Sequence, residues 1–551
     1  MKQKVLLLVS MLFAVQSAMW ACTNLIVGKK ASTDGSVIVS YSADSFGSFG
    51  FMCRYPAGKH PKGTMRPVYD WESNKYLGEI EEAAETYSVL GNMNEHQLTI
   101  TETTFGGRPE LVDTTGLLDY GSLIYITLQR ARTAREAIDV MTGLIDRYGY
   151  NSSGESITLA DPNEAWIMEL IGKGPGRKGA VWVAVRVPDD CISAHANHSR
   201  IHQFPLKDKK NCVYSKDVIR FAREQGYFDG KDSEFSFSKA YAPANFSALR
   251  FCEARVWSFF NRYADGMAAY LDYAMGDATK QPMPLFVKPK QKVSVQNIKD
   301  MMRDHYEGTP MAMDQDISAG PYEALHRPTP LTWKVDGKTY FNERPIGTQQ
   351  SAFVLVTQMR NWLPDYVGGV QWFGCDDAGM IALTPVYCGN MDVPECYDIK
   401  QGDIFTFSFK SAFWMCNWVS NMVYPRYKDL IGELQMVRDR LEQDYNNQQA
   451  EIEKQALDLA GDDGSQLEQA RAFLTKYSNG AGQKMMDSWM SLGQRLIVRY
   501  NDGLILKEQD GQYVRGEGGG PVSPERKGYP ERFRKQIVKE TGDRYLVPAE
   551  K

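Results

Sequence analysis

The sequence predicts an α+β fold with a helical extension at its C-terminal end. Strand-like apolar runs and helical segments alternate between Thr23 and Tyr427, which is typical of layered folds that contain both kinds of element. After Tyr427 the pattern becomes strongly helical, and we assign a helical extension to 428–510. The remaining tail, 511–551, is rich in glycine, proline and charged residues, so we expect a loop or an extended arm.

The composition excludes several classes of protein. The chain has 551 residues, enough for one large catalytic domain with appendages or for two to four ordinary domains. Its 43% hydrophobic and 24% charged residues are values of globular proteins, so disorder of the whole chain is excluded. A net charge of −5 argues against nucleic acid or an anionic membrane surface as the main partner.

The first 21 residues have the pattern of a cleavable signal peptide. Lys2 and Lys4 precede an apolar run over 5–15 that is too short to cross a bilayer, and small residues follow. A cut after Ala21 would release a mature chain that begins at Cys22. We therefore expect export to the periplasm or the medium, and we expect no membrane-spanning segment later in the chain. A lipid anchor on Cys22 is the minor alternative, because the bulky Trp20 fits a lipoprotein signal poorly.

The segment 22–427 is the predicted catalytic domain, and its elements follow from local patterns. The expected strands are 24–28, 36–42, 165–171, 180–187, 191–201, 348–359 and 379–389. A tight turn over 32–36 joins the first two strands. Two helices are expected within 110–149, and a buried helix over 411–427.

The helical extension begins with an apolar stripe. Leu430, Leu434, Val437 and Leu441 recur at helical spacing. Two heptads are too few for a coiled coil, so we expect this helix to pack on the main domain.

The cysteines and histidines do not form a metal motif. There are nine cysteines, and in an exported protein an odd number leaves at least one unpaired or lipidated. Cys388 and Cys396 are near enough in sequence to close a small loop, but spacing does not determine the pairing. His195, His198 and His202 have metal-like spacing, yet no carboxylate lies nearby in sequence, so a polar loop lining is the preferred interpretation. We predict no metal and no organic cofactor.

Cys22 is the residue of this sequence best suited to take part in a chemical reaction. GxSxG, GxxxxGK[ST] and HExxH motifs are absent from the sequence. After a cut at Ala21, Cys22 would carry both a thiol and an α-amine, and such an amine has a pKa of about 7.7–8.0. The amine could accept the thiol proton and later deliver it to a leaving amine, without a separate histidine. The residues alone leave three hypotheses open: nucleophile, lipid anchor, or disulfide partner or bystander.

Several ordered stretches resemble one enzyme family. "CTNLIVGKKASTDGSVIVSYSADS" (22–45) and "GNMNEHQLTITETTFGGR" (91–108) are the specific ones. "AWIMEL", "ISAHANHSRI", "LRFCEARVWS" and "GGVQWFGCDDAGMIALTPVYCG" support them in order along 22–427. They resemble the PepD-like bacterial dipeptidases, a family of cysteine N-terminal-nucleophile (Ntn) hydrolases related to bile-salt hydrolase and penicillin acylase. The resemblance implies a four-layer αββα sandwich.

The same resemblance implies roles for individual residues. Cys22 matches the nucleophile and its α-amine the base, and Asp44 matches an aspartate that holds the amino group. Asn197 matches a side-chain donor of the oxyanion hole. A catalytic arginine is expected near "LRFCEARVW", where Arg255 is preferred and Arg250 is kept as a substrate-binding candidate.

Two positions depart from bile-salt hydrolases. Tyr41 stands where those enzymes have an arginine, and Thr103 or Thr104 stands near their second oxyanion asparagine. Both differences favour a peptide over a bile salt, so Tyr41, Thr103 and Thr104 are candidate substrate-binding residues. The implied function is an exported cysteine dipeptidase that acts on dipeptides or small peptide amides, with the oligomeric state left open. The alternatives are an N-acyl amidohydrolase of bile-salt or lactam type, and a non-catalytic surface lipoprotein.

Overall fold

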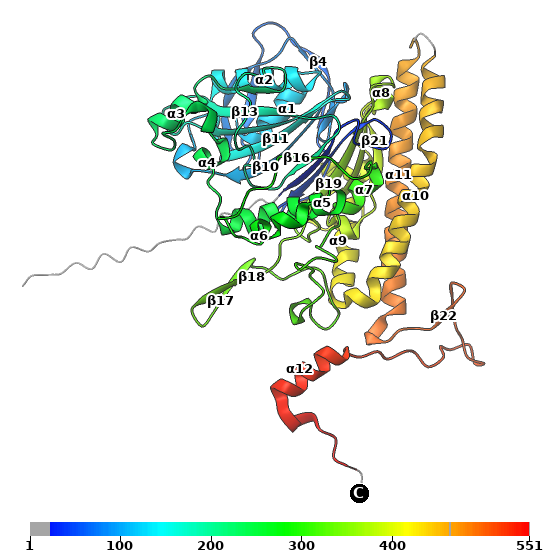
Figure 1. Cartoon of the computed structure of the whole chain (residues 1–551). Helices are drawn as coiled ribbons and strands as arrows, with labels where there is room; N and C mark the ends of the chain where they lie inside the picture. The colour runs from blue at the N-terminus through cyan, green and yellow to red at the C-terminus, as the bar shows by residue number, and fades with distance from the viewer. Residues whose placement is uncertain (1–21, 462–463, 550–551) are drawn as a thin grey trace, which may run out of the picture.

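The computed structural model describes residues 22–461 and 464–549, and the predicted signal peptide 1–21 lies outside these residues. The fold is built on two large antiparallel sheets (Figure 1). The first sheet has seven strands in the order β16 (Phe286–Val287), β14 (Ile192–His195), β1 (Thr23–Val27), β2 (Val37–Asp44), β19 (Ser351–Met359), β20 (Val370–Cys375) and β21 (Thr384–Tyr387). The second has eight, in the order β15 (Cys212–Tyr214), β13 (Ala180–Val187), β12 (Ala165–Gly172), β11 (Gly154–Ala160), β10 (Thr99–Gly106), β9 (Met93–Asn94), β8 (Val89–Leu90) and β3 (Arg54–Tyr55).

The β1–β2 hairpin lies in the middle of the first sheet. Every residue of both strands is buried. Gly35 adopts a φ of +90° in the connecting turn, a conformation that suits glycine. Because Thr23 pairs with Ser42, the end of β2 returns to the residue that precedes β1. The hairpin therefore brings Asp44 next to Cys22 in space.

Along the strands of both sheets, successive side chains point into different apolar cores. Ile26, Val37 and Val39 of the first sheet share one core with Ile167 and Val183 of the second. Their neighbours in sequence point the opposite way, since side chains along a strand alternate between its two faces. The two sheets therefore pack against each other through one apolar face each.

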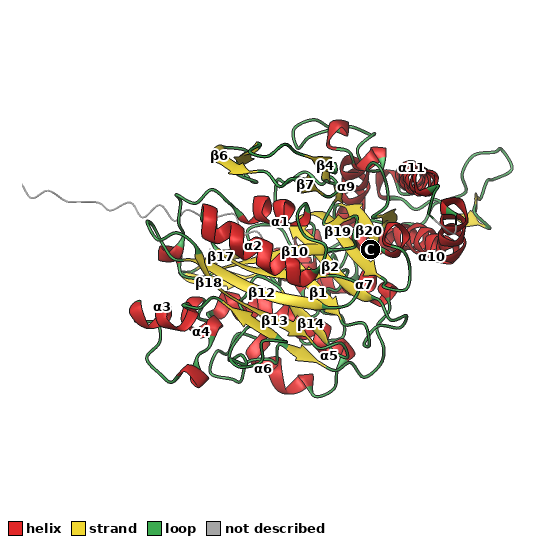
Figure 2. Cartoon of the chain, turned by 90° about the horizontal axis from the view of Figure 1, so that it is seen from above, coloured by secondary structure: helices red, strands yellow, loops and turns green. Residues whose placement is uncertain are grey.

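Helices cover the outer face of each sheet. On the second sheet, α1 (Tyr120–Leu128) and α2 (Ala134–Tyr148) share a core with β11 and β12 (Figure 2). On the first sheet, α5 (Ala254–Tyr263), α7 (Val295–Met301) and α9 (Ala412–Val423) share another core with β1, β19 and β20. The prediction of a mixed α and β fold is confirmed.

Two long helices form the C-terminal helical region. α10 (Tyr427–Ala460) and α11 (Leu467–Arg499) run side by side along one edge of the molecule (Figures 1 and 2). Leu430, Leu434 and Leu441 are buried, as their stripe predicts. The pair packs on the main domain as well, because Glu442 of α10 contacts Arg303 next to α7 and Glu453 contacts Arg360 next to β19.

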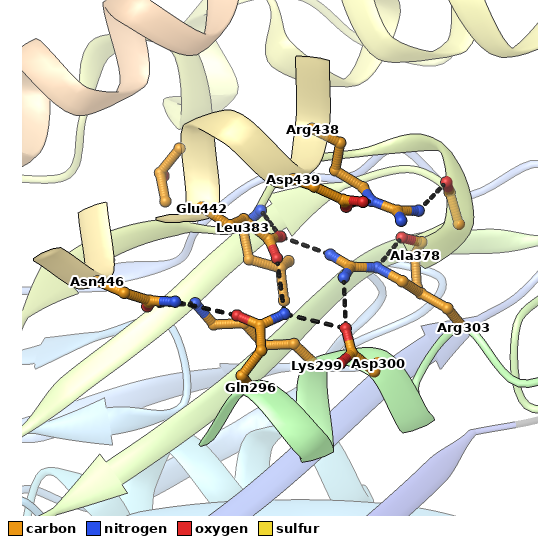
Figure 3. Close-up of polar contacts among 12 residues, drawn as sticks. Gln296, Lys299, Asp300, Arg303, Ala378, Leu383, Arg438, Asp439, Glu442 and Asn446 are labelled. Atoms are coloured by element: carbon orange, nitrogen blue, oxygen red, sulfur yellow. Dashed lines mark hydrogen bonds and ion pairs between the residues drawn. The ribbon is translucent and has the colours of Figure 1, made fainter. Parts of the chain in front are cut away.

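Polar contacts fasten α10 to the body of the protein (Figure 3). Glu442 accepts a hydrogen bond from the Leu383 backbone N–H at 2.9 Å and pairs with Arg303. Lys299 of α7 donates to Asn446 at 3.2 Å, and its ammonium lies 3.4 Å from the centroid of the Trp372 ring. The helical region is thus held by buried charges in addition to apolar contacts.

Some predicted elements differ in extent. The strand expected over 191–201 ends at His195, because Asn197 adopts a φ of +63° that a strand cannot accommodate. Only Thr384–Tyr387 of the segment 379–389 is a strand. The tail contains a helix that the sequence pattern does not predict, α12 (Glu531–Thr541), which begins directly after Pro530.

The remaining elements are short. The small helices are α3 (Val218–Glu224), α4 (Phe237–Tyr241), α6 (Leu271–Ala274) and α8 (Asp365–Gly368). Four two-stranded sheets pair β4 (Gly58–Lys59) with β7 (Glu85–Thr86), β5 (Met65–Tyr69) with β6 (Tyr76–Glu81), β17 (Thr332–Val335) with β18 (Lys338–Phe341), and β22 (Glu508–Gln509) with β23 (Gln512–Tyr513). All nine cysteines lie in the described part of the chain, and each is a free thiol there. Within the described ranges, we find no helix with the length and apolar character needed to cross a bilayer.

Candidate active site

Cys22 directly precedes β1 and is buried, with 1% of its surface exposed. Its Sγ lies 3.5 Å from Oε1 of Glu102 on β10 and 3.8 Å from the hydroxyl of Tyr41 on β2. The Tyr41 hydroxyl donates to the same Glu102 oxygen at 2.7 Å. The thiol therefore lies at the junction of the two sheets, in contact with a phenol and a carboxylate.

The surroundings of Cys22 keep its thiol protonated. Burial, followed by the negative charges of Glu102 and Asp44, raises the pKa of Cys22 well above its usual value. The backbone N–H of Asp44 and the Tyr41 hydroxyl oppose this shift by hydrogen bonding to the sulfur. Because the thiolate is the reactive form, a nucleophile at this position needs a base next to it.

Asp44 ends β2 and is completely buried. Its carboxylate accepts hydrogen bonds from Ser351 at 2.6 Å and Ser42 at 3.0 Å. It also forms an ion pair with Arg344 at 2.6 Å. A buried carboxylate held by three donors is fixed in position, so Asp44 provides a rigid negative charge beside Cys22.

Arg255 of α5 connects Cys22 to the loop that follows β14. Its guanidinium donates to the Cys22 carbonyl at 2.7 Å and to the Thr23 hydroxyl at 2.8 Å. The other terminal nitrogen donates to the Ala196 carbonyl at 3.0 Å and to Oδ1 of Asn197 at 2.9 Å. A planar fork with several donors suits this bridging position better than a lysine would. Of the two arginines proposed from the sequence, Arg255 contacts Cys22.

Asn197 occupies the left-handed backbone conformation just after β14. Its Oδ1 is held by Arg255, and its Nδ2 donates to the Thr104 carbonyl at 2.8 Å. The amide is therefore oriented from both sides, at the end of β10 that carries Glu102.

The other predicted residues are distributed around this centre. Thr103 exchanges a hydrogen bond with Nδ1 of His195 at 2.7 Å, while Thr104 donates to Glu155 of β11 at 2.8 Å. Arg250 forms an ion pair with Glu343. The structure thus brings Tyr41 to the thiol, and it directs Thr103, Thr104 and Arg250 to other partners.

A cavity of about 740 Å³ adjoins the site. Asn197, Arg255 and Arg344 contribute to its wall, as do Arg327 and Glu343. A volume of this size suits a small organic ligand, since typical ligand pockets enclose about 300–1,000 Å³. Three arginines against one glutamate give the charged part of the wall a positive balance.

Three residues of the site were not proposed from the sequence. Glu102 and Glu155 come from neighbouring strands, and Arg344 lies 300 residues away from its partner Asp44. Glu102 directly precedes Thr103 and Thr104, which the sequence did single out, so its position was within reach of sequence reasoning. Nothing in the local pattern around Arg344 points to Asp44.

The histidine segment has a structural arrangement. His195 is buried between Thr103 and Thr158, 2.7 Å from each hydroxyl, and burial lowers its pKa to about 3. His202 contacts the Ser236 hydroxyl at 3.2 Å. Among the residues that the structure covers, no group of three or more His, Cys, Asp and Glu side chains is placed to hold a metal ion.

Comparison with known proteins identifies the family. The profile of peptidase family C69 matches residues 21–53 and 48–440. The chain is similar to a probable dipeptidase from Salmonella dublin, with 26% identity over 389 residues that cover 67% of this chain and 81% of the relative. It is also similar to dipeptidase A from Lactobacillus helveticus, with 25% identity over 473 residues that cover 80% of this chain and 90% of the relative.

A dipeptidase from Bifidobacterium longum (strain NCC 2705) is 25% identical over 418 residues, which cover 68% of this chain and 72% of that relative. The resemblance noted from the sequence motifs is therefore confirmed at the level of the family. Because the profile spans most of the chain, including Cys22 and the strands around it, the protein belongs to peptidase family C69 and is a hydrolase of the peptidase class.

Proposed function

We propose that the protein is a cysteine dipeptidase whose nucleophile is Cys22, exposed at the N-terminus by cleavage after Ala21. The observation that carries this proposal is the convergence of Asp44 and Arg255 on Cys22, with Asn197 held by the same Arg255, from three separate parts of the chain. The names of the relatives support a dipeptide substrate.

The proposed reaction begins with proton transfer from the Cys22 thiol to its own α-amine. The sulfur then attacks the carbonyl carbon of the peptide bond and forms a tetrahedral oxyanion, for which the Asn197 amide is the side-chain donor. Collapse of this intermediate breaks the C–N bond, and the ammonium returns its proton to the leaving amine. Water then hydrolyses the thioester, which releases the first amino acid and regenerates the thiol.

The raised pKa of Cys22 supports the need for this amine. An α-amine with a pKa of about 7.7–8.0 is partly neutral at physiological pH and can accept a proton there. Asp44 lies beside Cys22 and could hold the ammonium form during the reaction, which would place the base next to the sulfur.

We further propose that the two sheets and their covering helices form the αββα sandwich of the Ntn hydrolases. The three separate apolar cores support this assignment: one lies between the sheets, and one lies under the helices on each outer face. The domain limits 22–427, 428–510 and 511–551, and export of the mature chain, are proposals that rest on the sequence pattern.

Two other functions are the alternatives to this proposal. An N-acyl amidohydrolase of bile-salt or lactam type would use the same nucleophile. Tyr41 replaces the arginine of bile-salt hydrolases and lies 3.8 Å from the thiol, which favours a peptide. A surface lipoprotein would carry its lipid on the same sulfur and amine, so lipidation and catalysis exclude each other.

Intact-mass measurement of the mature protein and a substrate panel test the proposal. We expect a chain that starts at unmodified Cys22 and hydrolyses dipeptides faster than conjugated bile salts. Cys22→Ser should abolish hydrolysis, whereas Cys53→Ser, a control at a half-buried free thiol, should retain it. A diacylglycerol adduct on Cys22, or equal rates for the wild type and Cys22→Ser, would refute the enzymatic proposal.

A further inference from the structure

Glu102 is a buried carboxylate in direct contact with the proposed nucleophile. It is 2% exposed, and its Oε1 lies 3.5 Å from Sγ of Cys22. Oε1 also accepts a hydrogen bond from Tyr41. The negative charge of this carboxylate raises the pKa of the Cys22 thiol and so disfavours the reactive thiolate. Its presence therefore needs a reason other than activation of the sulfur.

Glu102 forms a carboxyl pair with Glu155. Thr104 donates to Oε1 of Glu155, and Oε2 of each glutamate finds no donor among the other described residues. A single proton between the two groups satisfies both. Burial raises the pKa of both carboxyl groups, and the charge of Glu102 raises that of Glu155 further, well above its usual value. Glu155 is therefore the member that holds the shared proton, and the remaining negative charge belongs to Glu102.

No cation of the described chain neutralises this charge. Within residues 22–461 and 464–549, no lysine, arginine or histidine forms an ion pair with Glu102 or Glu155. The other acidic residue of the site, Asp44, does have such a partner in Arg344. A buried charge without a counter-charge is costly, and a cationic ligand would relieve that cost.

The position of Glu102 matches one atom of a dipeptide. A reactive complex places the attacked carbonyl carbon about 3–3.5 Å from the sulfur. The α-nitrogen of the same residue lies about 2.5 Å from that carbon, as the N–Cα and Cα–C bond lengths dictate. A carboxylate oxygen 3.5 Å from Sγ is therefore within hydrogen-bonding reach of this nitrogen.

Charged groups of opposite sign contact different atoms of Cys22. Glu102 of β10 and Tyr41 of β2 contact the sulfur, whereas Arg255 holds the Cys22 carbonyl and lines the cavity. A zwitterionic dipeptide has its ammonium beside the attacked carbonyl and its carboxylate farther along. This polarity fits a substrate whose N-terminal end lies at Glu102.

We propose that Glu102 binds the free α-ammonium of the substrate's N-terminal residue and thereby selects unblocked dipeptides over N-acylated amides. The inference rests on the proposed function. An N-acyl substrate would place a neutral group against the carboxylate and leave the charge buried without a partner. Glu102 is then the residue that separates a dipeptidase from an N-acyl amidohydrolase in this fold.

The experiment compares Ala-Ala with propionyl-alanine, which has the same peptide bond and lacks only the ammonium group. We expect the mature wild-type enzyme to prefer Ala-Ala in kcat/KM. Glu102→Gln should lower kcat/KM for Ala-Ala by about 10- to 100-fold, as expected for loss of a hydrogen bond to a charged group, and should leave propionyl-alanine within about threefold of its wild-type value. Glu110→Gln, at an exposed glutamate after the same strand, serves as the control.

The outcomes separate this inference from the proposed function. If the wild type cleaves no dipeptide at all, the proposed function fails. If it cleaves Ala-Ala and propionyl-alanine equally well, or if Glu102→Gln slows both substrates equally, the function stands and the role of Glu102 is refuted. If intact mass shows that the Glu102→Gln variant is not cleaved before Cys22, the wild-type enzyme alone provides the test. A preference for Ala-Ala over propionyl-alanine then supports the role of Glu102, and equal rates refute it.

Discussion

The contact between α10 and the main domain yields a prediction with a pH-dependent magnitude. Glu442 is 1% exposed and lies next to two cations, Arg303 and Lys299 (Figure 3). Glu442→Gln keeps the shape of the side chain and an acceptor for the Leu383 N–H, but it removes the negative charge. The variant therefore isolates the electrostatic part of this contact.

The loss of stability in Glu442→Gln depends on the contacts that Arg303 and Lys299 keep in the variant. Arg303 keeps Asp300 at 3.3 Å and the Ala378 carbonyl at 3.0 Å, so we expect the lower end of the usual cost of breaking a buried pair, about 3 kcal/mol. Burial lowers the pKa of Lys299 to about 7, and the charge of Glu442 opposes that shift. Without Glu442, the pKa of Lys299 falls further, and this lysine is neutral at pH 6 in the folded variant.

The pH dependence has a definite sign. In the unfolded chain Lys299 stays protonated up to a pH of about 10.4. Between pH 6 and 8 the folded wild type loses this proton, whereas the folded variant has already lost it at pH 6. Stability rises with pH where the unfolded state binds more protons, so it rises more steeply in the variant. The loss of stability caused by Glu442→Gln should be about 1.4 kcal/mol larger at pH 6 than at pH 8, since one pH unit corresponds to 1.36 kcal/mol.

Urea unfolding followed by tryptophan fluorescence at both pH values measures this difference, and hydrogen exchange in α7 and α10 localises it. Measured against the single variant Lys299→Met, the further loss caused by adding Glu442→Gln should be the same at both pH values. Glu451→Gln, at an exposed position of the same helix, should leave the unfolding free energy within about 0.5 kcal/mol of the wild type. Equal losses at pH 6 and pH 8 for Glu442→Gln would refute the coupling to Lys299.

Three further predictions concern the active site. Asn197→Ala should lower kcat for dipeptides by about 100- to 1,000-fold through loss of an oxyanion donor; steady-state kinetics check this, and an unchanged kcat would remove Asn197 from the mechanism. Arg255→Lys should lower kcat/KM at least about 100-fold, because one ammonium cannot bridge the Cys22 carbonyl and Asn197 together; near wild-type kinetics would contradict that bridging role. Arg344→Met leaves Asp44 without its counter-charge, so this carboxylate should raise the pKa of the Cys22 α-amine, the proposed base. The acidic limb of the kcat/KM profile should therefore move to higher pH, and a shift to lower pH would contradict the placement of Asp44 beside that amine.

Local sequence patterns predicted the hairpin that begins the fold. β1 and β2 are apolar runs joined by an Asp-Gly turn, and this alone brings Asp44 back to Cys22. The mixed α and β character and the Leu430–Leu441 stripe were equally visible, because both depend on periodicity within one element. Family motifs added Asn197 and Arg255, whose side chains meet through Oδ1.

The rest of the site depends on contacts between distant segments. Arg344 lies in a loop with no pattern of its own and becomes recognisable only through Asp44, 300 residues earlier. Glu102 occupies a polar strand where its neighbours Thr101 and Thr103 contact Asn24 and His195 of the first sheet. Its unpaired charge appears only once the two sheets are packed. The helix α12 was missed because the glycine and proline around it dominate the local composition.

The electrostatics of the thiol connect processing of the chain to its activity under the proposed mechanism. Glu102 and Asp44 both raise the pKa of Cys22, so the site contains no preformed thiolate. While Ala21 remains attached, the nitrogen of Cys22 is an amide and cannot accept the thiol proton. Cleavage replaces it with an amine whose pKa is about 7.7–8.0, on the residue beside which Asp44 lies. The charge of Asp44, which disfavours the thiolate before cleavage, then stabilises the ammonium that forms when the thiol transfers its proton. The same carboxylate thus keeps the site inactive at first and supports catalysis afterwards.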